Sequence, residues 1–122
     1  MRIILYLLVF KILYSCGQGD NSSTKDLLLG NCPDSIDATT NAGERLCKSY
    51  SILNVSCMNC HDDWRAYVTN SAWVNSSLVI EGNSFDSQLI YKLTNEGGNM
   101  PPNGDTLTES DVEVLKQWID AL

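Results

Sequence analysis

The sequence predicts an all-α fold of three main helices joined by long loops. Three stretches place apolar residues at helical spacing, two of them carry recognisable capping signals, and no stretch of convincing length alternates apolar with polar residues as a strand would. The chain of 122 residues is the length of one domain, and its 43% of apolar residues is enough for a hydrophobic core.

The first helix is expected near residues 42–54. Leu46, Tyr50 and Leu53 recur there at a spacing of four and then three residues, which places them on one face of a helix. This helix runs directly into a cluster of two cysteines and a histidine. The segment after that cluster, residues 62–83, shows no clear periodicity and is expected to be a long loop.

A second helix is expected to follow Ser84, a residue type that favours the N-cap position. Its buried face would carry Phe85, Leu89 and Leu93, and the glycines at 97–98 would end it.

The third helix extends to the end of the chain. Thr108 and Asp111 have the spacing of a capping box, in which each side chain accepts a hydrogen bond from the other residue's backbone amide. Behind them, Leu115, Ile119 and Leu122 keep a helical spacing.

The first fifteen residues predict export. They hold two of the eight basic residues and none of the fifteen acidic ones, and their apolar run is too short to cross a bilayer. Leu13-Tyr14-Ser15-Cys16 resembles the lipobox of bacterial lipoproteins, which implies a signal peptide at 1–15 and a lipid on Cys16. A cleaved signal without lipid and an uncleaved anchor are the alternatives. The polar residues that follow predict a tether, so we expect a lipid-anchored tether and N-terminal extension at 16–40 and the folded domain at 41–122.

The net charge and the number of cysteines further limit the partners and the bonding that this chain can have. A net charge of −7 without basic clusters argues against a nucleic-acid partner. In an exported chain cysteines are usually paired. With Cys16 assigned to the lipid and Cys57 and Cys60 to the motif below, Cys32 and Cys47 remain, either as a disulfide or as two buried free thiols.

Cys57, Cys60 and His61 form the C-x-x-C-H pattern that attaches a c-type haem. The two thiols bond the haem edge, and the adjacent histidine then lies under the iron as its first axial ligand. Three other interpretations of these cysteines and the histidine are the alternatives to haem attachment. A thioredoxin-like pair would need a β-α-β pattern, a zinc site would need Cys32 or Cys47 as a further ligand, and a Cys57–Cys60 disulfide would close a strained loop.

Met100 is the candidate for the second axial ligand. The chain has no second histidine, Met1 belongs to the leader, and Met58 lies inside the attachment loop. Two prolines directly after Met100 stiffen the chain and favour a loop that presents its thioether. The alternative is an ordinary surface methionine.

From about residue 42 to the end, the chain resembles a class I monohaem cytochrome c, and the planctomycete-type cytochrome c domains of bacteria in particular. The resemblance rests on the C-x-x-C-H motif, the Met-Pro-Pro loop and the final Leu-Lys-Gln-Trp-Ile segment. It implies a small cytochrome c fold wrapped around one covalently bound haem c, with Trp118 packing the last helix against the first near Leu53. Such domains usually orient the histidine with a proline carbonyl, and no proline lies between His61 and Met100.

The resemblance implies a one-electron carrier with His/Met ligation, not an enzyme, in the periplasm or on the extracytoplasmic membrane face. Its partners would be redox proteins with basic docking patches, because the chain is acidic. The alternatives are a haem-based sensor or gas-binding domain with a labile Met100, and an electron-transfer subunit docked on a larger oxidoreductase. Four further residues are candidates either for the haem propionates or for simple packing: Trp64, Arg65, Tyr67 and Trp73.

Overall fold

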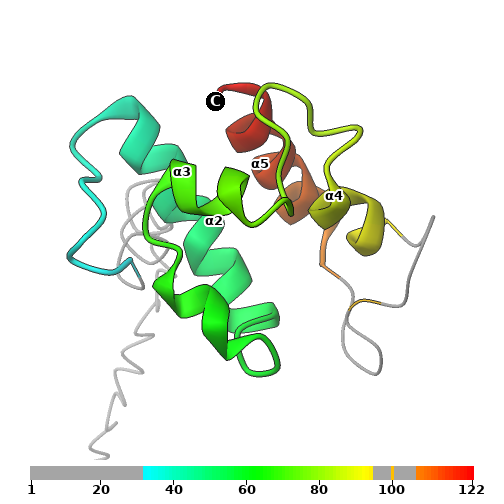
Figure 1. Ribbon diagram of the computed structural model, residues 1–122, viewed down its shortest axis with the longest axis horizontal. Helices are drawn as coiled ribbons and strands as arrows, with labels where there is room; N and C mark the ends of the chain where they lie inside the picture. The colour runs from blue at the N-terminus through cyan, green and yellow to red at the C-terminus, as the bar shows by residue number, and fades with distance from the viewer. Residues whose placement is uncertain (1–31, 95–99, 101–106) are drawn as a thin grey trace, which may run out of the picture.

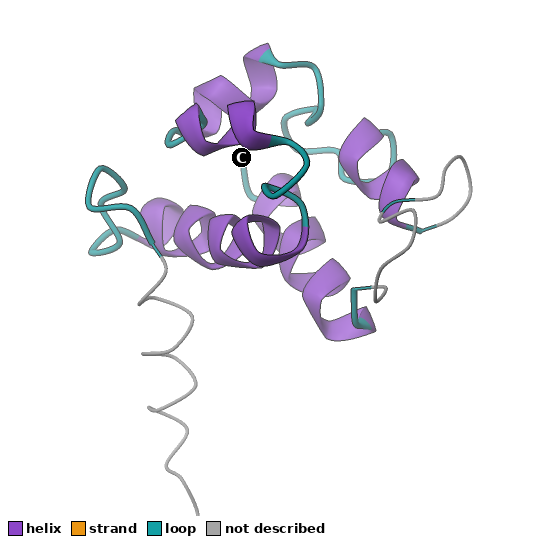
Figure 2. Cartoon of the chain, turned by 90° about the horizontal axis from the view of Figure 1, so that it is seen from below, coloured by secondary structure: helices purple, strands orange, loops and turns teal. Residues whose placement is uncertain are grey.

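The computed structural model describes residues 32–94, 100 and 107–122. Over these residues the chain is helical and contains no strand, in agreement with the predicted all-α class (Figures 1 and 2). The elements in chain order are α2 (Asn41–Ser56), the 3-10 helix η1 (Asp62–Ala66), α3 (Asn70–Asn75), α4 (Gln88–Leu93) and α5 (Glu109–Asp120).

Helix α2 confirms the first predicted helix and extends it by one residue at its start and two at its end. Thr40 is the N-cap, and its hydroxyl accepts a hydrogen bond of 3.0 Å from the Gly43 amide. A Cβ atom on Gly43 would overlap the carbonyl oxygen of Asp37, so only glycine lets the preceding turn approach the helix this closely. The predicted apolar face is buried, with Leu53 fully inaccessible.

A disulfide joins the segment before α2 to the helix. It links Cys32 to Cys47, whose Cα atoms are 5.3 Å apart. Of the two predicted alternatives, a disulfide or two buried free thiols, the structure has the disulfide. Ile36 lies between them in sequence and is part of the hydrophobic core. The N-terminal extension is therefore packed on the domain from residue 32 onward, whereas the predicted leader and Cys16 lie outside the described residues.

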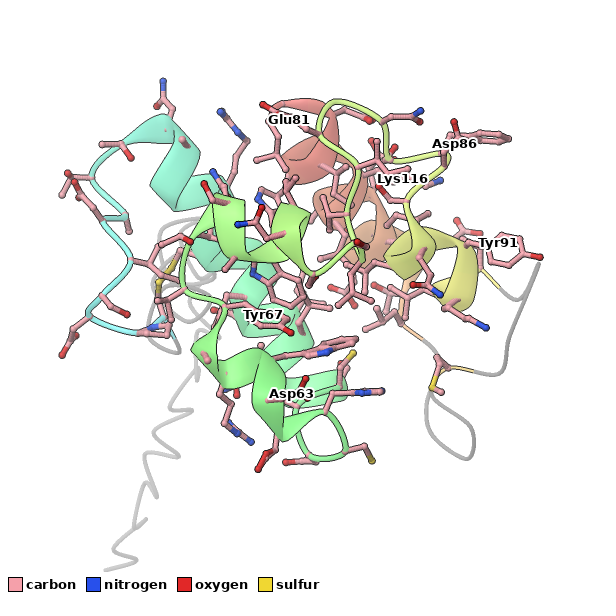
Figure 3. The ribbon with its side chains drawn as sticks, in the orientation of Figure 1. Asp63, Tyr67, Glu81, Asp86, Tyr91 and Lys116 are labelled. Carbon is pink, nitrogen blue, oxygen red and sulfur yellow. A yellow bond between two sulfur atoms is a disulfide. The ribbon has the colours of Figure 1, made fainter. Side chains whose placement is uncertain are left out.

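The loop predicted at 62–83 is partly wrong, because η1 and α3 form within it. Thr69 caps α3 by accepting a hydrogen bond of 3.2 Å from the Ala72 amide, and Trp73 on α3 is fully buried. Among the residues of η1 and α3 only Trp73 is buried, and others, such as Asp63 (labelled in Figure 3), are exposed, so these two elements leave no repeating apolar pattern in the sequence.

The start of the second predicted helix is also wrong. Helix α4 begins at Gln88 with Ser87 as N-cap, three residues later than expected. Ser84 is used elsewhere: its amide and hydroxyl donate to the Asp120 carboxylate at 2.7 and 2.9 Å. Phe85, which was expected on the buried face, is 84% exposed because the helix does not include it. The predicted end at 97–98 lies outside the described residues.

Helix α5 begins at the capping box that the sequence predicts. The Asp111 amide donates to the Thr108 hydroxyl at 3.1 Å, and the Thr108 amide donates to the Asp111 carboxylate at 3.3 Å. The helix packs against α2 and α4 (Figure 2), and Leu115, Trp118 and Ile119 are buried on it. In the part of the chain that the structure describes, no helix has both the length and the apolar character needed to cross a bilayer.

Candidate functional site

The C-x-x-C-H motif lies in a tight turn at the end of α2. The amide of Cys57 donates to the Leu53 carbonyl at 2.8 Å, which closes the helix. The amides of Cys60 and His61 both donate to the Cys57 carbonyl, at 3.1 and 3.0 Å. Because these bonds meet on one carbonyl, the chain curls, and the two cysteines and the histidine all line the same cleft.

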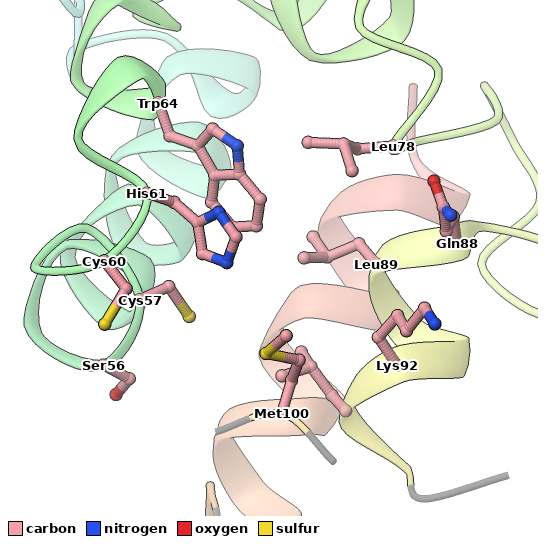
Figure 4. A pocket seen from close by; sticks show the side chains of 11 residues that line it. Ser56, Cys57, Cys60, His61, Trp64, Leu78, Gln88, Leu89, Lys92 and Met100 are labelled. Atoms are coloured by element: carbon pink, nitrogen blue, oxygen red, sulfur yellow. The ribbon is translucent and has the colours of Figure 1, made fainter. Parts of the chain in front are cut away.

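The imidazole of His61 is oriented by an aromatic neighbour. Helix η1 begins directly after the motif and places Trp64 so that the two rings stack, with centroids 4.3 Å apart and planes 12° from parallel. In Figure 4 both rings face the interior of the cleft. Stacking on Trp64 thus restrains the imidazole in a segment that lacks the orienting proline.

The cleft separates the motif from α4 and Met100 (Figure 4). The cavity has a volume of about 200 Å³, and its surface is mostly apolar. The facing wall is formed by Leu78, Gln88, Leu89, Lys92, Leu93 and Met100. The sequence did not identify Leu78, Gln88 or Lys92 as site residues. Gln88 and Lys92 are four residues apart, which places them on one face of a helix, and this spacing is the signal that could have linked them.

Met100 lies across the cleft from His61. It is 41% exposed, and its thioether points toward the wall that carries the two cysteines (Figure 4). The sequence-predicted pair of His61 and Met100 is therefore brought to opposite sides of one cavity. The prolines that follow Met100 lie outside the described residues.

The two motif thiols differ in their surroundings. Cys60 is exposed, whereas burial, with a smaller contribution from the neighbouring Cys60, raises the pKa of the Cys57 thiol to about 11. A thioredoxin-like redox pair relies on a thiolate stabilised by a lowered pKa. The raised value at Cys57 is the opposite of that arrangement, and the two sulfurs are not bonded to each other.

An aromatic cluster lies behind the cleft. The edge of Trp73 meets the rings of Trp64, Tyr67 and Trp118, with centroid distances of 5.6, 5.2 and 5.7 Å. The indole N–H of Trp118 donates to Asn70 Oδ1 at 2.9 Å. Trp73 Nε1, in contrast, is one of two buried side-chain polar atoms in the described residues that have no hydrogen-bond partner, the other being Ser49 Oγ. An unpaired buried donor costs about 1–3 kcal/mol. Trp73 does not line the cleft, so this N–H belongs to the core behind it.

Arg65, predicted as a candidate for carboxylate binding, does not line the cleft. Its guanidinium donates to Asn54 Oδ1 at 2.7 Å and to the Met58 carbonyl at 3.2 Å, on the outside of the motif turn. Tyr67 packs against Trp73. Of the four candidates, only Trp64 contributes to the lining.

No group of three or more histidine, cysteine or carboxylate side chains in the described ranges is arranged to hold a metal ion. The Cys32–Cys47 disulfide also leaves neither of these sulfurs free to complete a zinc site with the motif.

Comparison of the chain with protein-family models, with curated proteins and with solved structures found no match.

Proposed function

We propose that this chain is an exported one-electron carrier of the class I monohaem cytochrome c type, with one haem c covalently bound in the cleft. The observation that carries the proposal is the placement of Cys57, Cys60 and His61 on one wall of an apolar cleft and of Met100 on the other. The haem supplies a reversible one-electron change at its iron.

The residues present fit that group in two respects. A flat apolar plate matches the mostly apolar lining between the motif and α4. The donor set contains two thiols that would attach the haem and an imidazole and a thioether that would bind its iron.

Each residue then has a defined role. Cys57 and Cys60 would hold the haem covalently through their thiols, and His61 and Met100 would bind its iron. Leu89 and Leu93 keep water from the facing wall. Because protein side chains would occupy the ligand positions of the iron, no position would remain for a substrate, and we propose a carrier and not an enzyme.

The proposed redox partners follow from the net negative charge of the protein. A net charge of −7 would direct the protein to redox proteins with basic docking patches, in encounters weakened by salt. A lipid on Cys16 would hold the chain at a membrane surface, on the periplasmic or extracytoplasmic side. We propose no nucleic-acid partner.

The test is an optical spectrum of the full chain exported from a bacterial host with haem-attachment machinery. We expect a sharp low-spin ferrous spectrum, a weak far-red sulfur-to-iron band when oxidised, and no change with carbon monoxide. His61→Ala should abolish the low-spin spectrum, and Met100→Ala should remove the far-red band and admit carbon monoxide. Absence of haem from the wild-type chain would refute the proposal.

Rapid binding of carbon monoxide to the wild-type ferrous protein would instead indicate a gas-binding or sensor domain. A subunit docked on a larger oxidoreductase would instead copurify with that enzyme.

A further inference from the structure

Arg65 connects three parts of the chain around the motif turn. Its Nη1 donates to Asn54 in the last turns of α2, at 2.7 Å, and its Nη2 donates to the backbone carbonyl of Met58, at 3.2 Å. Its own carbonyl oxygen accepts a hydrogen bond of 3.1 Å from the hydroxyl of Tyr50, also on α2. Helix η1 is thereby fastened back onto the helix that precedes the motif.

The Met58 carbonyl, which accepts this hydrogen bond, belongs to the backbone between the two motif cysteines. Met58 lies between the two motif cysteines, and its side chain is fully buried, so its backbone is fixed from one side by the core and from the other by the guanidinium. The Met58 amide donates to the Leu53 carbonyl on α2 at 3.1 Å, and the Cys60 and His61 amides donate to the Cys57 carbonyl. Arg65 therefore adds a side-chain tie from η1 to the Met58 carbonyl, beside the backbone bond that joins Met58 to α2.

We propose that Arg65 is a positioning residue that presets the turn at 57–61, so that both thiols and the imidazole face the cleft before the cofactor is attached. Its role in attachment rests on the proposed function, whereas its bridging of the turn does not. Holding reacting groups in place lowers the entropic part of a barrier, and here two thiols must reach one ligand from a single turn.

The chemistry of the contact requires arginine. A planar guanidinium can direct two N–H groups at two separate acceptors, here an amide oxygen and a backbone carbonyl. Lysine would keep the charge, but all its N–H groups lie on one nitrogen at the end of a flexible chain, so it lacks the rigid planar fork of the guanidinium. Since Arg65 is exposed, its loss should affect the turn locally more than the stability of the whole fold.

The test compares Arg65→Gln and Arg65→Lys with Lys48→Gln in the full exported chain. The control removes the cation of the half-buried Glu44–Lys48 pair, whose charged atoms are 2.8 Å apart and which lies on α2, away from the turn. Amide hydrogen exchange is followed at Cys60 and His61. We expect both Arg65 variants to speed exchange there by about 5-fold or more, the loss of roughly one charge-assisted hydrogen bond, with core amides of α5 unchanged.

A second readout is covalent attachment, taken from the reduced pyridine spectrum, which reports the number of thioether bonds. Both Arg65 variants should contain a larger fraction of singly attached haem than the control. Asn54→Ala should have a smaller effect, because Arg65 retains the Met58 carbonyl. Exchange at the turn equal to that of Lys48→Gln, full rescue by lysine, or loss of protection throughout the protein would each overturn the proposal. Absence of haem from the wild-type chain refutes the proposed function instead, and the exchange rates still decide whether Arg65 holds the turn.

Discussion

Replacing Asp120 tests how the wall of the cleft is held. The Asp120 carboxylate, in the last turn of α5, accepts hydrogen bonds from the amide and the hydroxyl of Ser84, at 2.7 and 2.9 Å. Ser84 belongs to the loop that leads into α4, and the amide of Leu89 on α4 donates to the Leu78 carbonyl at 2.9 Å. The contact therefore fixes the segment that forms much of the facing wall.

The size of the expected loss in stability follows from how deeply Ser84 and Asp120 are buried. Ser84 is 7% exposed, so Asp120→Ala leaves a buried amide without its acceptor, at a cost of about 1–3 kcal/mol. Asp120 itself is exposed, and water weakens what its charge adds. We expect a loss of about 2 kcal/mol in the free energy of unfolding, and roughly 8 °C or more in the melting temperature. Asp120→Asn keeps one acceptor oxygen and should lose less than half as much.

The assay is urea unfolding, read as the change in midpoint at constant m-value. Glu113→Ala is the matched control, since that carboxylate lies on the same helix and accepts only an exposed hydrogen bond of 2.9 Å from Gln117. In a double-mutant cycle with Ser84→Ala, the two losses should add to more than that of the double variant. If Asp120→Ala is no less stable than Glu113→Ala, within about 0.5 kcal/mol, the reasoning fails.

Three further predictions concern the region before and at the start of α2. Replacing Cys32 and Cys47 together by serine should lower the free energy of unfolding by about 3 kcal/mol, and alkylation of Cys32 and Cys47 themselves in the native wild-type chain, located by peptide mass spectrometry, would contradict the disulfide. Gly43→Ala should destabilise the protein, because its Cβ would overlap the Asp37 carbonyl, although helix propensity alone predicts a gain of up to about 1 kcal/mol; thermal unfolding gives the sign. Hydrogen bonds from Thr39 hold the pKa of Asp37 below its ordinary value. The stability that Asp37 adds over Asp37→Asn should be present above about pH 3.9 and disappear as the pH falls through the lower folded-state pKa, and a difference independent of pH would argue against this.

Local sequence signals were reliable where the structure depends on neighbouring residues. The capping box of Thr108 and Asp111 involves residues three apart, and it begins α5 as predicted. The apolar face of α2 has a period that is independent of what packs on it. The close spacing of Cys57, Cys60 and His61 likewise brings them to one turn.

Local signals failed where distant residues compete. Ser84 has the chemistry of an N-cap, but Asp120, far along the chain, takes both its amide and its hydroxyl. Helix α4 therefore begins at Gln88, and Phe85 remains outside it. By residue type, Arg65 is a candidate either for the haem propionates or for packing, and in the structure it donates instead to Asn54 and to the Met58 carbonyl, because η1 folds back on α2.

The sequence by itself determined the helical class, the apolar face of α2, the capped start of α5, and the set of sulfur and imidazole groups at the motif, because these depend on spacing and residue chemistry over a few positions. Only the tertiary structure decided that Met100 faces His61 across an apolar cleft, that Trp64 orients the imidazole, and that Trp73 is buried with an unpaired N–H. These relations join segments brought together by packing of the helices, and their partners have no fixed separation along the chain.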